Sequence, residues 1–565
     1  MTSLTAAIAI TCLAAWCPAD DFPEPPDTEK DAAARPLAAA AAAAGFRDSA
    51  GLEVTVFAAE PDVRNPIALA WDGRGRLWVA ENYSYAGRPT NLEPGLRDRV
   101  VVFEDADADG RPDGRRVFHD DLRQLTSVEV GLGGVWLLCP PQLLFVPDAD
   151  GDARPDGPPI VVLDGFDVAG QNHHNFANGL RFGPDGWLYG RCGASCPGLV
   201  GRPGATETER VALAGGVWRY DPVSRRVEAV CHGTTNPWGH DWNAFGDGFF
   251  INTVNGHLWQ IIPGAHYVRA HTVDPNPYVY ELIDTHADHW HFDVAGGWQK
   301  SRDGAANDFG GGHAHSGAMI YLGDDWPAEM RGDLFTWNLH GRRANRERLE
   351  RRGSGYVGRH RPDVLVAADP FFRGIELSCG PDGAVYALDW SDTGECHEAT
   401  GVHRSSGRIY RIANRAGGPK RPRPDLPGLA TADLVALVTH ANEWHVRQAR
   451  LELAARAGGG PLGRLRAEFP ADPAATRPAF ERLVTAADPL VACRGLLAAH
   501  GSGIVDTAWL RRLLRHENEH LRVWAVRLIV DSWPLDGVQG PLPASRAVAD
   551  RVAAGSAGNS ARRRP

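Results

Sequence analysis

Apolar and polar residues alternate along the first two thirds of the chain, and Gly- or Asp-containing turns interrupt the alternation. Apolar side chains at every second position on both sides of such a turn are typical of an antiparallel β-hairpin. The hairpins lie at 68–81, 127–140, 179–192, 240–253, 319–339 and 376–389. Six units of roughly 50–60 residues predict an all-β six-bladed propeller over 51–414, with the first and last strands meeting to close the ring. A β-sandwich with extra strands is the alternative, and the even spacing disfavours it.

A helical pattern replaces this alternation from about residue 425 onward. The segments 437–457, 483–501 and 513–531 each combine a short helix, a polar turn and a second helix with apolar residues three or four positions apart. Repeated helical pairs predict a small α-helical HEAT-like solenoid over 425–535. Such a stack binds a partner protein or packs on the neighbouring domain. The last residues, 551–565, are expected to form a disordered tail.

An apolar stretch at the N-terminus predicts export. Residues 4–16 form a run of about 13 residues, which is too short to span a bilayer and suits a signal peptide. Small residues around Ala19 predict cleavage there, which gives a signal peptide over 1–19 and an Ala- and Pro-rich linker over 20–50. The protein is therefore expected in the periplasm or associated with the cell envelope. Cys12 and Cys17 leave a lipid anchor open.

Composition narrows the function classes. The 565 residues are 43% hydrophobic and 23% charged, which excludes a mainly disordered or fibrous protein. The net charge of −11 argues against a nucleic-acid partner, because such proteins usually carry a basic surface. The chain contains no C-x-x-C-H motif, so no covalently attached haem c is expected.

Two Asp-rich loops carry candidate calcium ligands. The first contains Asp105, Asp107, Asp109 and Asp113, and the second contains Asp148, Asp150, Asp152 and Asp156. Carboxylates at alternate positions of a tight loop can converge on one hard cation. Because Arg116 stands where an EF-hand has its bidentate glutamate, the first loop is interpreted as a partial calcium loop. A solvated turn is the alternative.

Histidines gather between the predicted hairpins. They are His173, His174, His232, His240, His286, His289, His291, His313 and His315. Loops at strand ends converge on one mouth of a propeller, so these side chains and Arg373 are expected to line one funnel. A general base and a set of transition-metal ligands are both compatible with such a cluster. Arg373 could hold an anion there.

The hairpins also carry a family resemblance. The stretches NHHNFANGLRFGPDGWLYG (172–190), HGTTNPWGHDWN (232–243) and GGGHAHSGAMIYLGD (310–324) are among those that match. Residues 52–412 resemble the propeller of the membrane-bound dehydrogenase proteins of planctomycetes and verrucomicrobia, a group that includes PVC-type haem-binding CxxCH proteins. In that family a HEAT-like region and a c-type cytochrome domain commonly follow the propeller. Because the cytochrome is missing here, the resemblance implies a separate cytochrome as partner.

More distantly, the propeller is similar to the soluble quinoprotein glucose/sorbosone dehydrogenases, which oxidise sugars with pyrroloquinoline quinone and calcium. This resemblance implies that His174, which precedes a GPDG hairpin, is the catalytic base. We expect His240 as a second catalytic residue, and Asn236, Arg373, His313 and His315 as cofactor-binding residues. Thr235 stands where that family has a quinone-holding arginine.

These observations predict an exported oxidoreductase-like propeller that oxidises a sugar or polyol with a quinone-type cofactor. Two alternatives remain open at this point. One is a non-catalytic propeller that binds glycans or proteins. The other is a metalloenzyme that uses His289, His291, His313 and His315.

Overall fold

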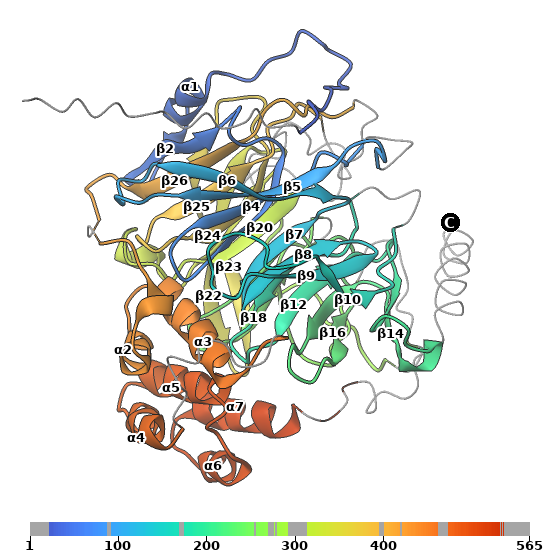
Figure 1. The fold of residues 1–565 in the computed structure, drawn as a ribbon. Coiled ribbons are helices and arrows are strands. Elements are labelled where there is room, and N and C mark those ends of the chain that lie inside the picture. The colour runs from blue at the N-terminus through green and yellow to red at the C-terminus, as the bar shows by residue number, and fades with distance from the viewer. Residues whose placement is uncertain are drawn as a thin grey trace, which may run out of the picture.

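The computed structural model describes the chain apart from residues 1–21, 87–91, 169–173, 254–255, 269–275, 277–278, 292–313, 395–400, 419–420, 462–472, 532, 534 and 536–565. Within this part of the chain, a six-bladed β-propeller is followed by a group of α-helices that packs beneath it (Figure 1). The predicted propeller is therefore confirmed. Every helix in the described ranges is too short or too polar to span a bilayer.

The first three blades are antiparallel sheets whose strands follow in chain order. Blade 1 contains β3 (Pro66–Trp71), β4 (Leu77–Glu81), β5 (Asp98–Glu104) and β6 (Gly114–Leu122). Blade 2 contains β7 (Ser127–Gly131), β8 (Gly134–Cys139), β9 (Gln142–Pro147) and β10 (Ile160–Asp164). Blade 3 contains β11 (Asn178–Phe182), β12 (Leu188–Cys192), β15 (Gly216–Tyr220) and β16 (Val227–His232), with a side hairpin of β13 (Gly198–Val200) and β14 (Val211–Leu213).

The remaining three blades are less uniform. Blade 4 has β17 (Gly239–Trp242), β18 (Gly248–Ile251) and β19 (Trp259–Gln260) in the described residues. Blade 5 contains β20 (His315–Ile320), β21 (Leu334–Asn338), β22 (Arg343–Arg352) and β23 (Gly355–Val366), extended by β1 (Arg47–Asp48). Blade 6 contains β24 (Gly374–Cys379), β25 (Val385–Asp389), β26 (Arg408–Asn414) and β2 (Leu52–Ala59).

The ring closes between the two ends of the propeller sequence. Strand β2 pairs antiparallel with β26, from Leu52 opposite Asn414 to Ala59 opposite Arg408. The N-terminal strand thus completes the last blade, and the expected closure is confirmed. A shared blade ties the first and last segments of the ring together, so neither blade edge is left unpaired there.

Part of the segment expected to be a linker packs on the propeller instead. Within 20–50, the structure places helix α1 (Ala39–Ala44) and strand β1, and β1 pairs with β23. Ala42 and Ala43 are buried. Alanine has the highest helix propensity of all residues, and its small side chain lets the helix approach the sheet closely. The alanine run is therefore a structural element of the domain.

Helices α2 to α7 follow the propeller as three consecutive pairs. The pairs are α2 (Thr431–Leu437) with α3 (Glu443–Ala457), α4 (Pro473–Val484) with α5 (Pro489–Gly501), and α6 (Thr507–Leu513) with α7 (Glu519–Val530). Asn442, Asp488 and Asn518 accept backbone N–H groups at the starts of α3, α5 and α7, which fixes where these helices begin. The second helices of the pairs contact one another in order. Their assignment to the HEAT class stays a prediction.

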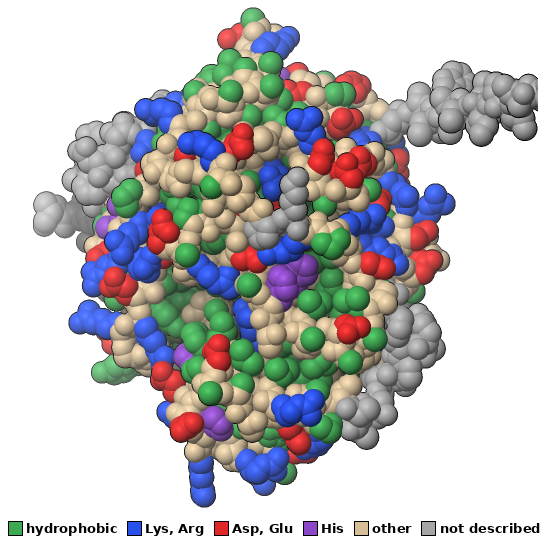
Figure 2. Space-filling model, turned by 90° about the vertical axis from the view of Figure 1, so that its left-hand side faces the viewer, with side chains coloured by type: hydrophobic (Ala, Val, Ile, Leu, Met, Phe, Trp, Pro, Cys, Tyr) green, Lys and Arg blue, Asp and Glu red, His purple; other side chains and the backbone are tan. Residues whose placement is uncertain are grey.

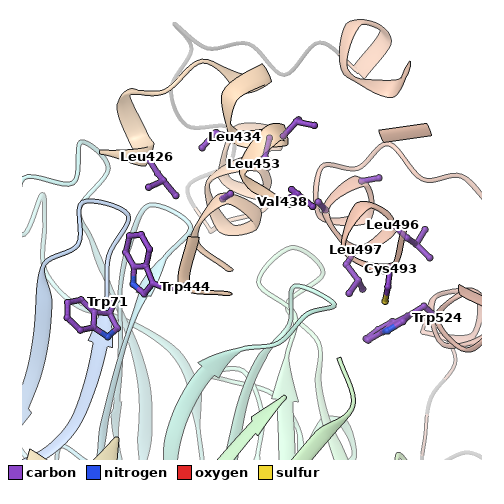
Figure 3. Close-up of a cluster of buried hydrophobic side chains, with 14 of the residues drawn as sticks. Trp71, Leu426, Leu434, Val438, Trp444, Leu453, Cys493, Leu496, Leu497 and Trp524 are labelled. Atoms are coloured by element: carbon purple, nitrogen blue, oxygen red, sulfur yellow. The ribbon is translucent and has the colours of Figure 1, made fainter. Parts of the chain in front are cut away.

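The helices cover one mouth of the propeller channel. Figure 3 shows Trp444 of α3 beside Trp71 of β3, within a buried apolar cluster that continues through the helices. Trp524 of α7 donates its Nε1 hydrogen to the carbonyl oxygen of Phe245 (2.7 Å), in the turn between β17 and β18. The side-chain Nδ2 of Asn442, just before α3, donates to the carbonyl oxygen of Gly380 (2.9 Å), in the turn between β24 and β25. Helices α3 and α7 thus lie against inner hairpin turns at this end of the channel.

Charged side chains of both signs intermix over the face shown in Figure 2, with apolar side chains between them. The net charge of −11 is therefore not gathered into a patch of one sign on this face. A strong local field, of the kind that steers a highly charged ligand, is not a feature of this face.

Candidate active site at the open mouth of the propeller

The mouth opposite the helices contains a cavity of about 130 Å³ that all six blades help to line. The lining residues that matter below are Tyr85, His174, Asn236, Trp238, Arg373, Trp390 and Asp392. Most of them lie where an innermost strand begins or where the strand after it ends. Because these strand ends meet at one end of the channel, residues far apart in the sequence come together here.

His174 is held by a short hydrogen-bonded unit. Its backbone carbonyl oxygen accepts the indole Nε1 hydrogen of Trp238 (2.8 Å), and the same Nε1 lies 2.9 Å from Asn236 Oδ1. The contact assigns Oδ1 of Asn236 as the acceptor, so its NH2 group can donate to a ligand hydroxyl. His174 and Asn236, both predicted from sequence, therefore lie on one wall together with the ring of Trp238.

The backbone of Asn236 is fixed from the neighbouring strand. Its N–H donates to Asn252 Oδ1 (3.0 Å), and its carbonyl oxygen accepts the N–H of Thr253 (2.9 Å). Asn236 and Thr253 both line the cavity. This wall is therefore built before a ligand arrives, which reduces the entropy lost on binding.

An aromatic wall comes from blades 1 and 6. The rings of Tyr85 and Trp390 lie edge to face, with centroids 5.8 Å apart. Trp390 also donates from Nε1 to Asp392 Oδ2 (3.4 Å). Aromatic faces beside hydroxyl, amide and carboxyl groups suit a sugar ring, which has apolar C–H faces and a polar edge. Sequence reasoning missed Tyr85, Trp390 and Asp392, which no motif connects to His174.

Arg373 lines the cavity, but its guanidinium is engaged by backbone. It donates to the carbonyl oxygens of Pro370, Phe372, Thr393 and Gly394, at 2.8 to 3.1 Å. Burial raises the pKa of Asp392, which disfavours a negative charge on that carboxyl group. Backbone carbonyls thus use most of the N–H donors of Arg373, which leaves few of them for an anionic ligand.

Pyrroloquinoline quinone carries three carboxylates, so its site needs several cationic or N–H donors. Among the cavity residues that the structure describes, Arg373 is the one guanidinium or ammonium group, and four carbonyls already occupy it. Thr235 has no charge to replace the arginine of the quinoprotein motif. The described residues do not fit this quinone.

His240 lies outside the mouth cavity, on the buried inner strand β17. Its Nδ1 is 2.6 Å from Arg191 Nη1, and Arg191 Nε donates to Asn178 Oδ1 (2.7 Å). Burial, followed by the positive charges of Arg191, Arg181 and Arg447, lowers the pKa of His240 well below its ordinary value. A neutral imidazole that accepts from Arg191 carries its hydrogen on Nε2.

The other predicted histidines lie elsewhere. His313 falls outside the described residues. His289 and His315 contribute to a cluster between blades 4 and 5 that also contains His257, His291 and Glu347. Successive side chains of a strand point to opposite sides, so Ala314 and Ser316 face the mouth while His315 faces the cluster. The residues expected in one funnel therefore lie in three separate places: the mouth cavity, the surroundings of Arg191, and the cluster between blades 4 and 5.

The histidine cluster was only partly visible in the sequence. Burial and the neighbouring His291 lower the pKa of His257 to about 4, which keeps its imidazole neutral. Glu347 lies in an Arg-rich run of β22, 56 residues from His291, and no spacing rule connects the two. Only the packing of blade 4 against blade 5 joins them.

The Asp-rich loops form the turns between β5 and β6 and between β9 and β10. Oxygens of Asp105, Asp107 and Asp113 lie within 4.8 Å of one another, and so do those of Asp148, Asp150 and Asp152. The carboxylates of both loops also accept backbone N–H groups, for example Asp113 from Ala106 (2.7 Å) and Asp156 from Ala149 (2.6 Å). Calcium at the first loop stays a prediction.

The family comparison covers the propeller part of the chain. Residues 39–416 match the family model whose description is "Domain of unknown function (DUF7133)". A comparison with curated proteins finds no match.

Among solved structures, the chain is similar to three bacterial proteins. The first is described as an oxidoreductase (glucose dehydrogenase) from Thermus thermophilus, with 20% identity, a TM-score of 0.43, and coverage of 64% of this chain and 100% of that one. The second is the PQQ-bound aldose sugar dehydrogenase of Streptomyces coelicolor, with 15% identity, a TM-score of 0.42, and coverage of 65% of this chain and 99% of that one. The third is the soluble aldose sugar dehydrogenase of Escherichia coli in its apo form, with 16% identity, a TM-score of 0.40, and coverage of 64% of this chain and 100% of that one.

Proposed function

Because the chain belongs to a family described only as a domain of unknown function (DUF7133), we propose its activity from its own geometry. The protein is an exported, oxidoreductase-like propeller that binds an uncharged sugar or polyol in the mouth cavity and oxidises one of its hydroxyl groups. One observation carries this proposal. His174, Asn236 and Trp238 form a hydrogen-bonded unit in the wall of a cavity that the aromatic pair Tyr85 and Trp390 also lines.

Each residue has a chemical role in this proposal. The ring of Trp390 contacts the apolar face of the sugar, and the NH2 group of Asn236 donates to one of its hydroxyl groups. His174 accepts the proton of the reacting hydroxyl as a general base. The two electrons leave with the carbon-bound hydrogen as a hydride, which an external two-electron acceptor, such as a soluble dye, takes up. The described residues contribute binding, orientation and the base.

A non-catalytic glycan-binding propeller is the second candidate. The observation that favours it is the backbone engagement of Arg373, which leaves the described cavity without a spare cation for a quinone cofactor. Both candidates share the same cavity and the same ligand class. In the first candidate His174 takes the proton of the reacting hydroxyl group, and in the second it takes no proton.

The experiment combines binding with turnover. A panel of neutral sugars and polyols is titrated calorimetrically into the full chain, and reduction of a soluble quinone-type dye is followed with the same panel. The proposal expects at least one compound that both binds and reduces the dye. Binding without dye reduction would support the second candidate, and absence of binding would contradict both.

We also propose that the three helical pairs are HEAT-like repeats that present a surface to a protein partner. Support comes from the order of the pairs, in which α3, α5 and α7 pack on one another. An electron-accepting partner such as a separate cytochrome would be recognised on the exposed sides of these helices. Copurification of a haem protein with the full chain, lost after truncation of the last pair, would test this proposal.

A further inference from the structure

Three histidines and one glutamate meet between blades 4 and 5, away from the mouth cavity. His257 lies just before β19, His289 and His291 belong to the connecting segment 284–291, and Glu347 lies in β22. One ligand atom from each of the four residues lies within 4.8 Å of the other three. None of the four lines the mouth cavity.

Three imidazole nitrogens lie within 3.5 Å of one carboxylate oxygen. Glu347 Oε1 lies 2.8 Å from His291 Nε2, 3.2 Å from His289 Nε2 and 3.5 Å from His257 Nε2. Ligand atoms held at about 2.0–2.1 Å around a tetrahedral zinc ion are about 3.3 Å apart. The three nitrogens therefore surround the carboxylate at separations that a single small ion would satisfy.

The polar atoms of the cluster are buried, so each of them needs a bonding partner inside the protein. The side chains of His291 and Glu347 are fully buried, and that of His257 is 2% exposed. His257 Nε2 is buried and makes no hydrogen bond to a described residue, its nearest carboxylate oxygen being 3.5 Å away. A buried polar atom without a partner is costly. A bound cation would satisfy this nitrogen together with the carboxylate.

A second layer of polar groups supports the first. His289 places its other ring nitrogen, Nδ1, 2.9 Å from Asp288 Oδ1, and Asp288 is paired with Arg359. A carboxylate on the far nitrogen is the usual way to orient a metal-binding imidazole. This contact leaves Nε2 of His289 as the atom directed at Glu347.

We propose that His257, His289, His291 and Glu347 bind one divalent transition-metal ion of the zinc class. Imidazole nitrogens with one carboxylate suit zinc, and four protein ligands make a closed shell of the kind found in structural sites. The ion joins segment 284–291 to blades 4 and 5. Backbone hydrogen bonds of the described residues hold this segment at two points: at Leu258, through His286 N to Leu258 O (2.9 Å), and at Gly358, through Asp288 N to Gly358 O (3.1 Å) and Gly358 N to His286 O (2.9 Å).

The test measures metal in the full chain as purified and after chelation. Elemental analysis is expected to find about one zinc-class ion per chain. Chelation is expected to lower the melting temperature and to increase amide exchange within 284–291, and added zinc is expected to reverse both. Cobalt(II) added to the chelated protein is expected to give the intense visible absorption of a tetrahedral site.

Two variants and a control make the test specific. His291→Ala and Glu347→Gln should each weaken zinc binding by at least about tenfold. His445→Gln changes a buried histidine of α3 that lies 3.2 Å from Pro381 O, and it should leave zinc binding unchanged. If the variants fail to fold, the cobalt spectrum of the wild-type chain still decides. Absence of metal uptake, or a weak octahedral spectrum, would overturn the proposal.

Discussion

Arg447 of helix α3 forms an ion pair with Asp241 of β17, with Nη2 of the arginine 2.9 Å from Oδ1 of the aspartate. The same Oδ1 lies 3.1 Å from Arg181 Nη1, while Oδ2 accepts the N–H of Ile320 in β20 (2.9 Å). The Asp241 side chain is 1% exposed. One buried carboxylate therefore joins helix α3 to blades 3, 4 and 5.

Replacing this arginine is expected to destabilise the whole chain. Breaking a buried ion pair by removing one partner typically costs about 3–5 kcal/mol. Arg447→Met should fall at the lower end, about 3 kcal/mol, because Asp241 keeps Arg181 as a partner. Chemical denaturation followed by tryptophan fluorescence measures the change.

The matched control is another ion pair between propeller and helices. Arg351 of β22 and Glu519 of α7 are 2.7 Å apart, but their side chains are 37% and 51% exposed. Exposed pairs contribute about 0–1 kcal/mol, so Arg351→Met should have a small effect. Equal losses in the two variants would contradict the central role given to Asp241.

Glu129 at the covered end of the channel gives a pH prediction. Burial raises the pKa of this carboxyl group from 4.5 to about 7. A group whose pKa is raised on folding favours the folded state below its unfolded pKa, and this contribution is lost as the pH rises through about 7. Between pH 4.5 and pH 8, the wild-type chain should therefore lose about 3 kcal/mol relative to Glu129→Gln.

Unfolding free energies of both proteins across this pH range test the prediction. Glu53→Gln, at an exposed position of β2, is the control and should follow the wild-type curve. Parallel curves for the wild type and Glu129→Gln would show that burial does not perturb this carboxyl group.

Trp238 is expected to control ligand affinity through its hydrogen bonds. Trp238→Phe keeps an aromatic ring but removes the Nε1 donor to His174 O and Asn236 Oδ1. Without these contacts Asn236 and His174 lose their fixed orientation, and ordering them again on binding, at about 0.5–1.5 kcal/mol for each side chain, should lower the affinity for the sugar about tenfold. Calorimetric titration measures it, with Trp533→Phe at an exposed position as control. Equal affinities in the two variants would remove Trp238 from the binding wall.

Calcium at the first Asp-rich loop is a separate prediction. Oxygens of Asp105, Asp107 and Asp113 converge there, and an ion that binds only the folded chain stabilises it by mass action. The melting temperature should rise between chelator and roughly millimolar calcium, the range of extracellular modules. Asp107→Asn should abolish this rise. The prediction is wrong if calcium leaves the melting temperature of the wild-type chain unchanged.

The propeller was predictable because its signal is local. Each hairpin carries its own alternation and its own turn, and buried aromatic residues such as Trp78, Trp136, Phe250 and Trp337 lie in those strands. Local pattern could not show that the alanines of α1 pack on the sheet. That packing depends on a surface formed by strands far along the chain, such as β23.

The candidate site was only partly predictable for a related reason. His174 and Asn236 stand in motifs, so the sequence identifies them. The alternation along β20 separates Ala314 and Ser316 from His315, but it does not tell which side faces the mouth. Glu347 was missed because the packing of two blades, rather than any spacing, brings it to His257 and His291.

The most direct test of the proposed function is the dye-reduction rate with and without the base. The value of kcat/KM for the best sugar or polyol is measured in the wild-type chain and in His174→Gln. A positioned general base contributes about 10²–10⁴-fold, so the variant should lose that factor while its calorimetric affinity stays close to wild type. An unchanged kcat/KM in His174→Gln would contradict the proposal that His174 takes the proton in this cavity.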